Sequence, residues 1–394
     1  MLKDQIPAIQ ESLAAAGVDG WLFSCFQSSD PVSTDLLGLG GRLVSRRCYY
    51  LIPATGEPKK LVHKLEPEML AHLPGSTATY LAWQEYREQL TALVSGHAKL
   101  AAQYSPDNAL PSISRLDAGT AELLRSAGVE LETSAELVQR FAATWSEEQL
   151  ESHRRAATHL HRIVLEAFDQ VKNELTGGGE SDEYRIQSFI LERFEAAGMW
   201  TESPPIVAVN AHAADPHYQP SAERTSPIRR GDFLLIDLWA KEKPPTSIYG
   251  DICWCGVCDT APTDRQAEIW DVAVRARDAA LAVVTGGYPH GEVRGFEVDD
   301  AARRVIQEAG HGDYFIHRTG HSIGTEDHGQ GANMDNLETH DTRRLAPMTG
   351  FSIEPGIYFP GDFGVRTEIN VALTPDAAEV TGGKPQGELL RLLA

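Results

Sequence analysis

The chain of 394 residues is long enough for about two or three domains, each with its own hydrophobic core. Hydrophobic residues make up 42% of the chain and charged residues 23%, which are ordinary globular values and exclude a fibrous or largely disordered protein. The 56 Asp and Glu residues outnumber the 35 Lys and Arg residues, giving a formal net charge of −21. A surface this acidic disfavours nucleic acid and anionic membranes as partners.

Targeting signals are not evident in the sequence. The opening stretch MLKDQIPAIQESL is charged from its third residue and has no apolar core of a signal peptide. No apolar run approaches the roughly 18 residues that span a bilayer. Five cysteines, an odd and modest number, fit a reducing compartment better than a disulfide framework. These features predict a soluble cytoplasmic protein.

Residues 1–145 are predicted to form a small α/β domain, because short apolar runs alternate with amphipathic ones. Gly17 ends the first amphipathic stretch, as a residue suited to a left-handed turn should. The GLGG run at 38–41 lacks the third glycine of a dinucleotide-binding loop and is interpreted as a turn. No catalytic constellation is evident in this half. The expected helices cover 6–16, 83–94 and 120–128, and the expected strands cover 21–25, 48–52, 59–63, 99–105 and 129–133.

Residues 146–394 are predicted to form an α+β domain with helices covering one face of a curved sheet. Ser146 and Gln149 have the spacing of a capping box that opens a helix reaching about residue 175. The further helices are expected at about 182–198, 263–284 and 296–309, and strands at 205–210, 233–240, 251–257, 351–359 and 364–373.

The second half carries acids where strands should be apolar. Asp237, Glu354 and Glu368 interrupt apolar runs, and Asp251 opens another. An unpaired buried carboxylate costs several kcal/mol unless it is protonated, pairs with a cation or binds a metal. One such acid alone is explained as well by the solvent side of an alternating strand. Four in one domain, with Arg366 the only basic residue in these runs, favour a metal site.

His321, in HRTGHSIG, adds one neutral imidazole to this set. The five side chains would carry a charge of −4, which two divalent cations would cancel. Ligands that are mostly oxygen suit manganese or a similar ion better than a structural zinc. Two cations bridged by carboxylates can hold a water as hydroxide near neutral pH. The HExxH helix of common zinc proteases is absent.

These motifs resemble the pita-bread metallopeptidases, the group of Xaa-Pro aminopeptidases, prolidases and methionine aminopeptidases. The resemblance covers 146–394 nearly end to end, through IDLWAK and YGDICW around the two aspartates, HRTGHSIG, IEPGIYFPG and GVRTEI. It implies that Asp237 binds one metal and that Asp251 and Glu368 bridge both. His321 and Glu354 would complete the second metal site, with Glu354 also shuttling a proton.

Four outer residues are implied by the same resemblance. His217 and His328 would contact the scissile carbonyl and steady the tetrahedral intermediate, and His317 matches a histidine of the proline-specific members. Arg366 would hold a bridging carboxylate. Two departures stand out: the connection between the aspartates is long, with Pro244 and Pro245 at its tip, and Cys253 replaces a common hydroxyl residue.

The N-terminal half more loosely resembles the accessory domain of the proline-specific members and creatinases. This similarity implies the proline branch and a homodimer. The resulting prediction is an Xaa-Pro dipeptidase that binds two divalent ions, Mn²⁺ first and Co²⁺ or Zn²⁺ otherwise. Its substrate would be a small peptide, cut before proline by a hydroxide bridging the two metals. An Xaa-Pro aminopeptidase is the alternative, because the sequence does not indicate whether Arg366, Arg46 or Arg47 captures a substrate carboxylate.

Three other interpretations use single motifs. GHSIG at 320–324 satisfies G-x-S-x-G, but the 72 residues after Ser322 leave little room for the rest of a serine-hydrolase sheet. CWCGVC at 253–258 offers three thiols and no nearby fourth, so core packing is favoured over zinc. A non-catalytic binding protein on the same fold is a third possibility, against which all five ligand positions argue.

Overall fold

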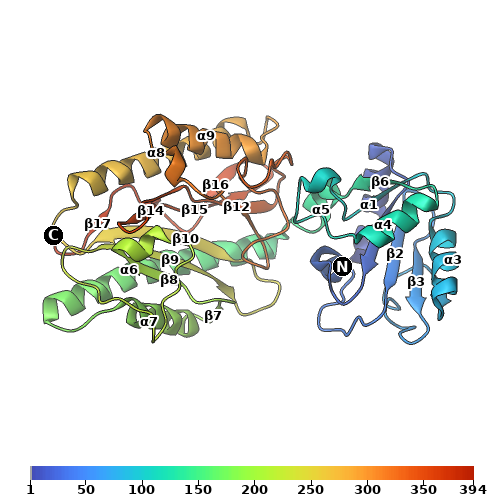
Figure 1. Cartoon of the computed structure of the whole chain (residues 1–394), viewed down its shortest axis with the longest axis horizontal. Coiled ribbons are helices and arrows are strands. Elements are labelled where there is room, and N and C mark those ends of the chain that lie inside the picture. Colours follow the sequence, from blue (N-terminus) through green and yellow to red (C-terminus); the bar gives the residue numbers. More distant parts are fainter. Residues whose placement is uncertain (1) are drawn as a thin grey trace. The chain divides into compact units, whose positions relative to one another are not determined.

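The structure, a computed structural model, describes residues 2–394 and divides into two compact units (Figure 1). The first unit ends at Ala143 and the second runs from Thr144 to Ala394. Within the described residues, no helix is both long and apolar enough to cross a membrane.

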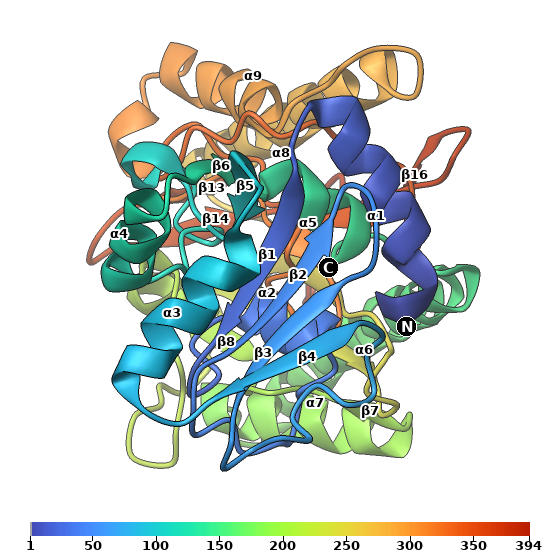
Figure 2. The same ribbon diagram turned by 90° about the vertical axis from the view of Figure 1, so that its right-hand side faces the viewer.

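The first unit is built on a six-stranded mixed sheet in the order β4-β3-β2-β1-β5-β6, seen from the front in Figure 2. The side chains of β1 alternate between two cores, because Trp21 and Phe23 pack against α1 and α5, whereas Leu22 packs against α3 and α4. The strands are β1 (Gly20–Cys25), β2 (Cys48–Pro53), β3 (Lys59–His63), β4 (Ser76–Tyr80), β5 (Lys99–Ala102) and β6 (Glu130–Thr133). The helices are α1 (Leu2–Ala16), α2 (Pro31–Leu36), α3 (Trp83–Val94), α4 (Ala118–Ser126) and α5 (Ala135–Phe141).

Each helix and strand predicted for this half has a counterpart, whereas β4, α2 and α5 were not expected. Gly17 follows α1 with a φ of 65°, the left-handed conformation that suits glycine. The GLGG run falls in a turn after α2.

The second unit contains three sheets and four long helices. One sheet has the order β17-β10-β9-β7 with β8 also paired to β9, the second has the order β11-β12-β15-β16, and the third joins β13 to β14. Ser146 and Gln149 form the predicted capping box at the start of α6. The helices are α6 (Glu147–Gly177), α7 (Glu183–Ala196), α8 (Asp264–Gly287) and α9 (Gly295–Glu308). The strands are β7 (Met199–Trp200), β8 (Ile206–Val209), β9 (Phe233–Glu242), β10 (Gly250–Val257), β11 (Ser322–Ile323), β12 (Thr349–Ile353), β13 (Gly356–Tyr358), β14 (Gly364–Arg366), β15 (Ile369–Leu373), β16 (Ala378–Val380) and β17 (Leu390–Arg391).

The sheets of this unit lie between two helical layers. Helices α6 and α7 pack on β8, β9 and β10, while α8 packs on β12, β13 and β14 and also contacts α9 (Figure 1). Strand β10 also contacts β14 and β15 across the middle. The unit therefore has an α+β architecture with its helices outside and strand faces turned toward each other inside.

Two predicted strands are broken in the structure. The run 351–359 splits into β12 and β13 on either side of Glu354 and Pro355, and the run 364–373 splits into β14 and β15 around Glu368. Proline has no N–H to donate to a strand ladder, which accounts for the first break. Glu354 and Glu368 thus occupy gaps between strands rather than strand interiors.

Candidate metal centre

Asp237 and Asp251 are brought together by the antiparallel pairing of β9 and β10. In this register Asp237 lies opposite Cys253 and Asp251 lies opposite Trp239, so both carboxylates project from the same face. The alternate residues of β9, such as Ile236, pack against α6 and α7. The two aspartates therefore point inward, with exposed fractions of 7% and 5%.

The two glutamates and the histidine come from the facing half of the unit. The Glu354 N–H donates to Thr319 O at 2.7 Å, and the Glu368 N–H donates to Cys253 O at 3.2 Å. The second bond ties the Glu368 turn directly to the strand that carries Asp251.

His321 is held by close backbone contact with β12. Its N–H donates to Ser352 Oγ at 3.0 Å. A Cβ on the preceding Gly320 would lie 1.9 Å from Ser352 O, a distance that no side chain tolerates. Glycine at this position is what allows the histidine segment to approach the strand.

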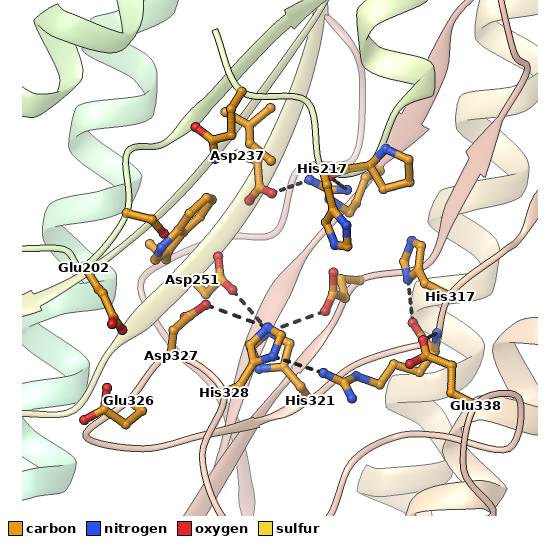
Figure 3. A pocket seen from close by; sticks show the side chains of 18 of the residues that line it. Glu202, His217, Asp237, Asp251, His317, His321, Glu326, Asp327, His328 and Glu338 are labelled. Atoms are coloured by element: carbon orange, nitrogen blue, oxygen red, sulfur yellow. Dashed lines mark hydrogen bonds and ion pairs between the residues drawn. The ribbon is translucent and has the colours of Figure 1, made fainter. Parts of the chain in front are cut away.

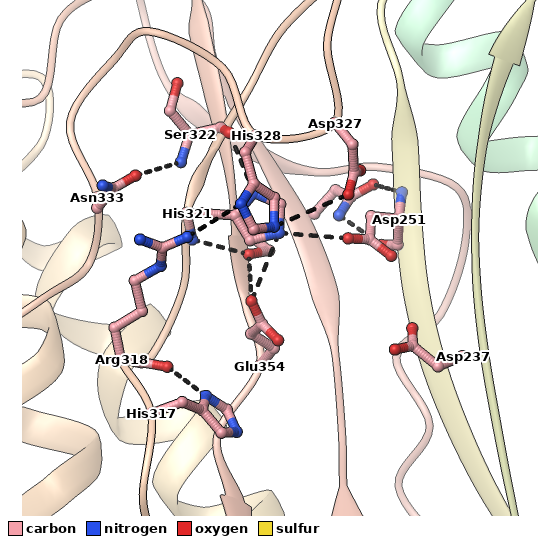
Figure 4. Close-up of polar contacts among 12 residues, drawn as sticks. Asp237, Asp251, His317, Arg318, His321, Ser322, Asp327, His328, Asn333 and Glu354 are labelled. Atoms are coloured by element: carbon pink, nitrogen blue, oxygen red, sulfur yellow. Dashed lines mark hydrogen bonds and ion pairs between the residues drawn. The ribbon is translucent and has the colours of Figure 1, made fainter. Parts of the chain in front are cut away.

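All five predicted ligands therefore reach one region, where Figure 4 shows Asp237, Asp251, His321 and Glu354. His321 Nε2 lies 3.3 Å from Asp251 Oδ2 and 3.5 Å from Glu354 Oε1. Donor atoms of Asp251, His321 and Glu368 all lie within 4.8 Å of one another. Asp237 lines the same cavity and forms an ion pair with Arg366.

The donor set fits divalent ions. Asp237 Oδ1, Asp251 Oδ1 and Glu368 Oε1 are buried and have no hydrogen-bond partner within residues 2–394. Buried carboxylate oxygens are nearly always paired, so three unpaired ones among these clustered acids indicate a cationic partner. Asp and Glu oxygens with one imidazole nitrogen match the preferences of hard to borderline metal ions.

Burial also sets the ionisation of the cluster. It raises the pKa of Asp237 to about 6, although Arg366 opposes the shift, and raises the pKa of Asp251 to about 7. Burial likewise raises the pKa of Glu354 and Glu368 and lowers the pKa of His321. A bound cation would favour the ionised carboxylates and the neutral imidazole, which are the ligand forms.

The outer residues form a chain of hydrogen bonds beside this cluster. His317 donates from Nδ1 to Arg318 O at 2.7 Å, and its Nε2 lies 2.7 Å from the Tyr358 hydroxyl. Arg366 donates to that hydroxyl at 3.0 Å and pairs with Asp237. Arg366 therefore pairs with Asp237, which was expected to bind a single metal, and not with Asp251 or Glu368, the carboxylates expected to bridge both metals.

His217 and His328 line the same cavity. The ring of His328 lies 4.1 Å from the ring of His321, centroid to centroid, and the His217 side chain is exposed. Figure 3 shows both histidines directed into the space in front of the carboxylates. The neighbouring His321, burial and Arg318 hold the pKa of His328 below its usual range, so this ring is neutral near pH 7.

The cavity has a volume of about 860 Å³ and contains residues that the motif analysis did not single out. Arg318 lies within HRTGHSIG, and Asp327 directly precedes His328, so both were visible in the sequence as charged neighbours of proposed site residues. No local signal marked the remaining charged lining residues, which are Glu202, Glu326 and Glu338.

The rival motifs are accounted for by packing. Ser322 is buried, and its hydroxyl accepts a hydrogen bond from the Gly331 N–H at 2.9 Å. All five cysteines are buried with free thiols, and the Cys253 and Cys255 side chains of β10 pack in a hydrophobic core. These observations favour a structural role for both motifs.

Comparison with known proteins agrees with this geometry. Residues 151–375, more than half of the chain, match metallopeptidase family M24. The chain is 28% identical to the probable dipeptidase PepE of Mycobacterium bovis over 350 residues, 87% of this chain and 85% of that protein. It is 31% identical to the Xaa-Pro dipeptidase of Lactobacillus delbrueckii subsp. lactis over 237 residues, 59% and 57% of the two chains. The crystal structure of dipeptidase PepE from Mycobacterium ulcerans shares the fold, with a TM-score of 0.74, 23% identity and coverage of 100% and 98%.

The chain belongs to metallopeptidase family M24. This membership confirms the pita-bread fold expected from the motifs and makes the protein a peptidase of the metal-dependent class.

Proposed function

We propose that the protein is a metal-dependent Xaa-Pro dipeptidase. The observation that carries the proposal is that Asp237, Asp251, His321 and Glu354 line one cavity and that Glu368 lies within 4.8 Å of Asp251 and His321, with three buried oxygens of this group lacking protein partners. The relatives named as dipeptidases and Xaa-Pro dipeptidases support the choice of substrate.

Each residue near the cavity has a distinct task in this proposal. The five ligands would hold two divalent ions, which when bound supply the activated water and polarise the scissile carbonyl. His328 and His217 would donate hydrogen bonds to that carbonyl as its oxygen gains charge. Glu354 would carry the proton from the attacking water to the leaving proline nitrogen.

Arg366 and Tyr358 would act by positioning. The guanidinium contacts Asp237 Oδ2 and the Tyr358 hydroxyl, which in turn lies 2.7 Å from His317. This chain fixes the orientation of one proposed ligand and of one side of the cavity.

The test is proline release from Xaa-Pro and Xaa-Pro-Yaa peptides by protein stripped with a chelator and then given manganese. Restored cleavage of Xaa-Pro with little cleavage of the longer peptide is the expected result. The Glu354→Ala variant should keep its fold but lose turnover, whereas Glu308→Ala, a change at an exposed acid of α9, should behave like the unaltered protein.

Other results would redirect the proposal. Efficient cleavage of Xaa-Pro-Yaa would indicate an Xaa-Pro aminopeptidase, and no activity with any divalent ion would indicate a binding protein. Manganese as the natural ion, the homodimer and the cytoplasmic location remain predictions from the sequence.

A further inference from the structure

Arg318 is the one arginine besides Arg366 that lines the cavity of the described chain. Arg366 is buried and forms an ion pair with Asp237. Arg318 is partly exposed, and its guanidinium donates a hydrogen bond from Nη2 to His328 Nδ1 at 3.2 Å. A guanidinium has five N–H groups, so this residue of the cavity wall has further donors to offer a ligand.

The backbone around Arg318 is fixed from both sides. Arg303 donates to His317 O at 2.9 Å, and Asp299 accepts from the Thr319 N–H at 2.9 Å. Asp299 and Arg303 are themselves paired on α9 at 2.8 Å. The Glu338 carboxylate accepts a hydrogen bond from the Arg318 backbone N–H at 3.1 Å, not from the guanidinium. The charge is therefore held in place without being neutralised by a described carboxylate.

Charge is distributed unevenly across the cavity. Figure 4 shows Arg318 and Asp327 on opposite sides of the His321 and His328 rings. Figure 3 shows Glu202 and Glu326 on the same side as Asp327. A free dipeptide carries an ammonium group at one end and a carboxylate at the other, so it matches this asymmetry.

We propose that Arg318 binds the C-terminal carboxylate of the dipeptide substrate and thereby selects dipeptides over longer peptides. The inference rests on the proposed function. In Xaa-Pro the carboxylate carbon is three bonds from the scissile carbonyl carbon, about 4 Å at most. A substrate whose carbonyl meets His328 therefore brings its carboxylate close to Arg318, whose Nη2 is 3.2 Å from that ring. In a longer peptide the same position holds a neutral amide.

The test is a cycle of substrate and protein changes in the manganese-loaded protein. Ala-Pro and its neutral analogue Ala-Pro-amide are compared in unaltered protein, Arg318→Gln and Arg318→Lys. Arg304→Gln is the matched control, because Arg304 is an exposed residue of α9 outside the cavity. Circular dichroism and bound manganese content establish that each variant is folded and loaded.

The expected result is a loss of about 10- to 100-fold in kcat/KM for Ala-Pro in Arg318→Gln, mostly through KM, which is the usual worth of a charged hydrogen bond. Ala-Pro-amide should change by less than about 3-fold, and Arg318→Lys should retain part of the preference for the free carboxylate. Equal losses on both substrates would overturn the inference, because they would assign Arg318 to holding His328. Absence of any cleavage by the unaltered protein would refute the proposed function and this inference with it.

Discussion

His153 of α6 is completely buried and uses both of its ring nitrogens. Its Nδ1–H donates to Tyr249 O at 2.6 Å, and its Nε2 accepts from the Thr381 hydroxyl at 2.8 Å. Tyr249 directly precedes the strand that carries Asp251, so this contact fixes the start of β10. Because the neutral ring satisfies both partners, a second ring proton would oppose the Thr381 contact and place an unpaired charge in the core.

Burial lowers the pKa of His153 from 6.5 to about 4 in the folded protein. The folded pKa lies below the unfolded value, so the unfolded chain binds the proton first as the pH falls. The contribution of neutral His153 to stability is complete above about pH 6.5 and is lost between there and about pH 4. The shift corresponds to on the order of 3 kcal/mol across that window, at about 1.4 kcal/mol per pH unit.

Asparagine can keep the donor to Tyr249 but cannot be protonated. His153→Asn is therefore expected to cost about 1–3 kcal/mol at pH 7.5, where Thr381 loses its acceptor, and to lose most of that disadvantage by pH 4.5. The assay is urea unfolding followed by circular dichroism from pH 7.5 to 4.5, in the presence of chelator. His290→Asn, an exposed site, is the control and should keep the original pH dependence. Parallel curves for His153→Asn and the unaltered protein would refute the argument.

Three further changes probe the proposed metal centre. Without metal, Glu368→Gln should raise the unfolding free energy by about 1 kcal/mol or more, because it removes one of the crowded buried carboxylates. Added manganese should then stabilise the variant far less than the unaltered protein, and the midpoints of thermal unfolding would show the difference. Gly320→Ala should destabilise the fold by about 1–3 kcal/mol in urea unfolding, because its Cβ would meet Ser352 O at 1.9 Å. Arg366→Lys should weaken manganese binding about 10- to 100-fold in a calorimetric titration, because lysine cannot keep the forked contact beside Asp237.

Each of these has a clear contrary result. A Glu368→Gln variant that is less stable without metal would mean that the carboxylate is satisfied by the protein alone. Unchanged stability of Gly320→Ala would mean that the segment can move away from β12. An unchanged manganese dissociation constant in Arg366→Lys would remove the positioning role of the arginine.

Local signals in the sequence were enough to predict many elements. Helix α3 occupies 83–94 as expected, and the capping box at Ser146 marks the start of the long helix α6. Such signals depend on residues within a few positions of each other, so a linear pattern contains them. The four proposed carboxylate ligands were also visible, because an acid inside or at the start of an apolar run is unusual, and His321 was found through the HRTGHSIG motif.

The remaining features depend on contacts between distant segments. The breaks at Glu354 and Glu368 follow from where each strand finds its partner, although Pro355 could have indicated the first. The position of Arg318 beside His328 depends on the loop after α9, which Asp299 holds. No periodicity in the sequence reports which charged loop residues will face a cavity.

Trp145 supports the second unit from a position before the segment that matches the family. Its backbone N–H donates to Met348 O at 2.5 Å, and its indole fills the space where a Cβ on Gly350 would lie, 2.0 Å from the ring. At the other end, the Gln386 side chain makes two hydrogen bonds to the backbone of Cys255, at 2.9 and 2.6 Å. Both residues lie outside the 151–375 segment shared with the family. The segment shared with the family is therefore shorter than the second unit, which runs from Thr144 to Ala394. A fragment cut to the family boundaries would keep all five proposed ligands but lose contacts that support the strands near them.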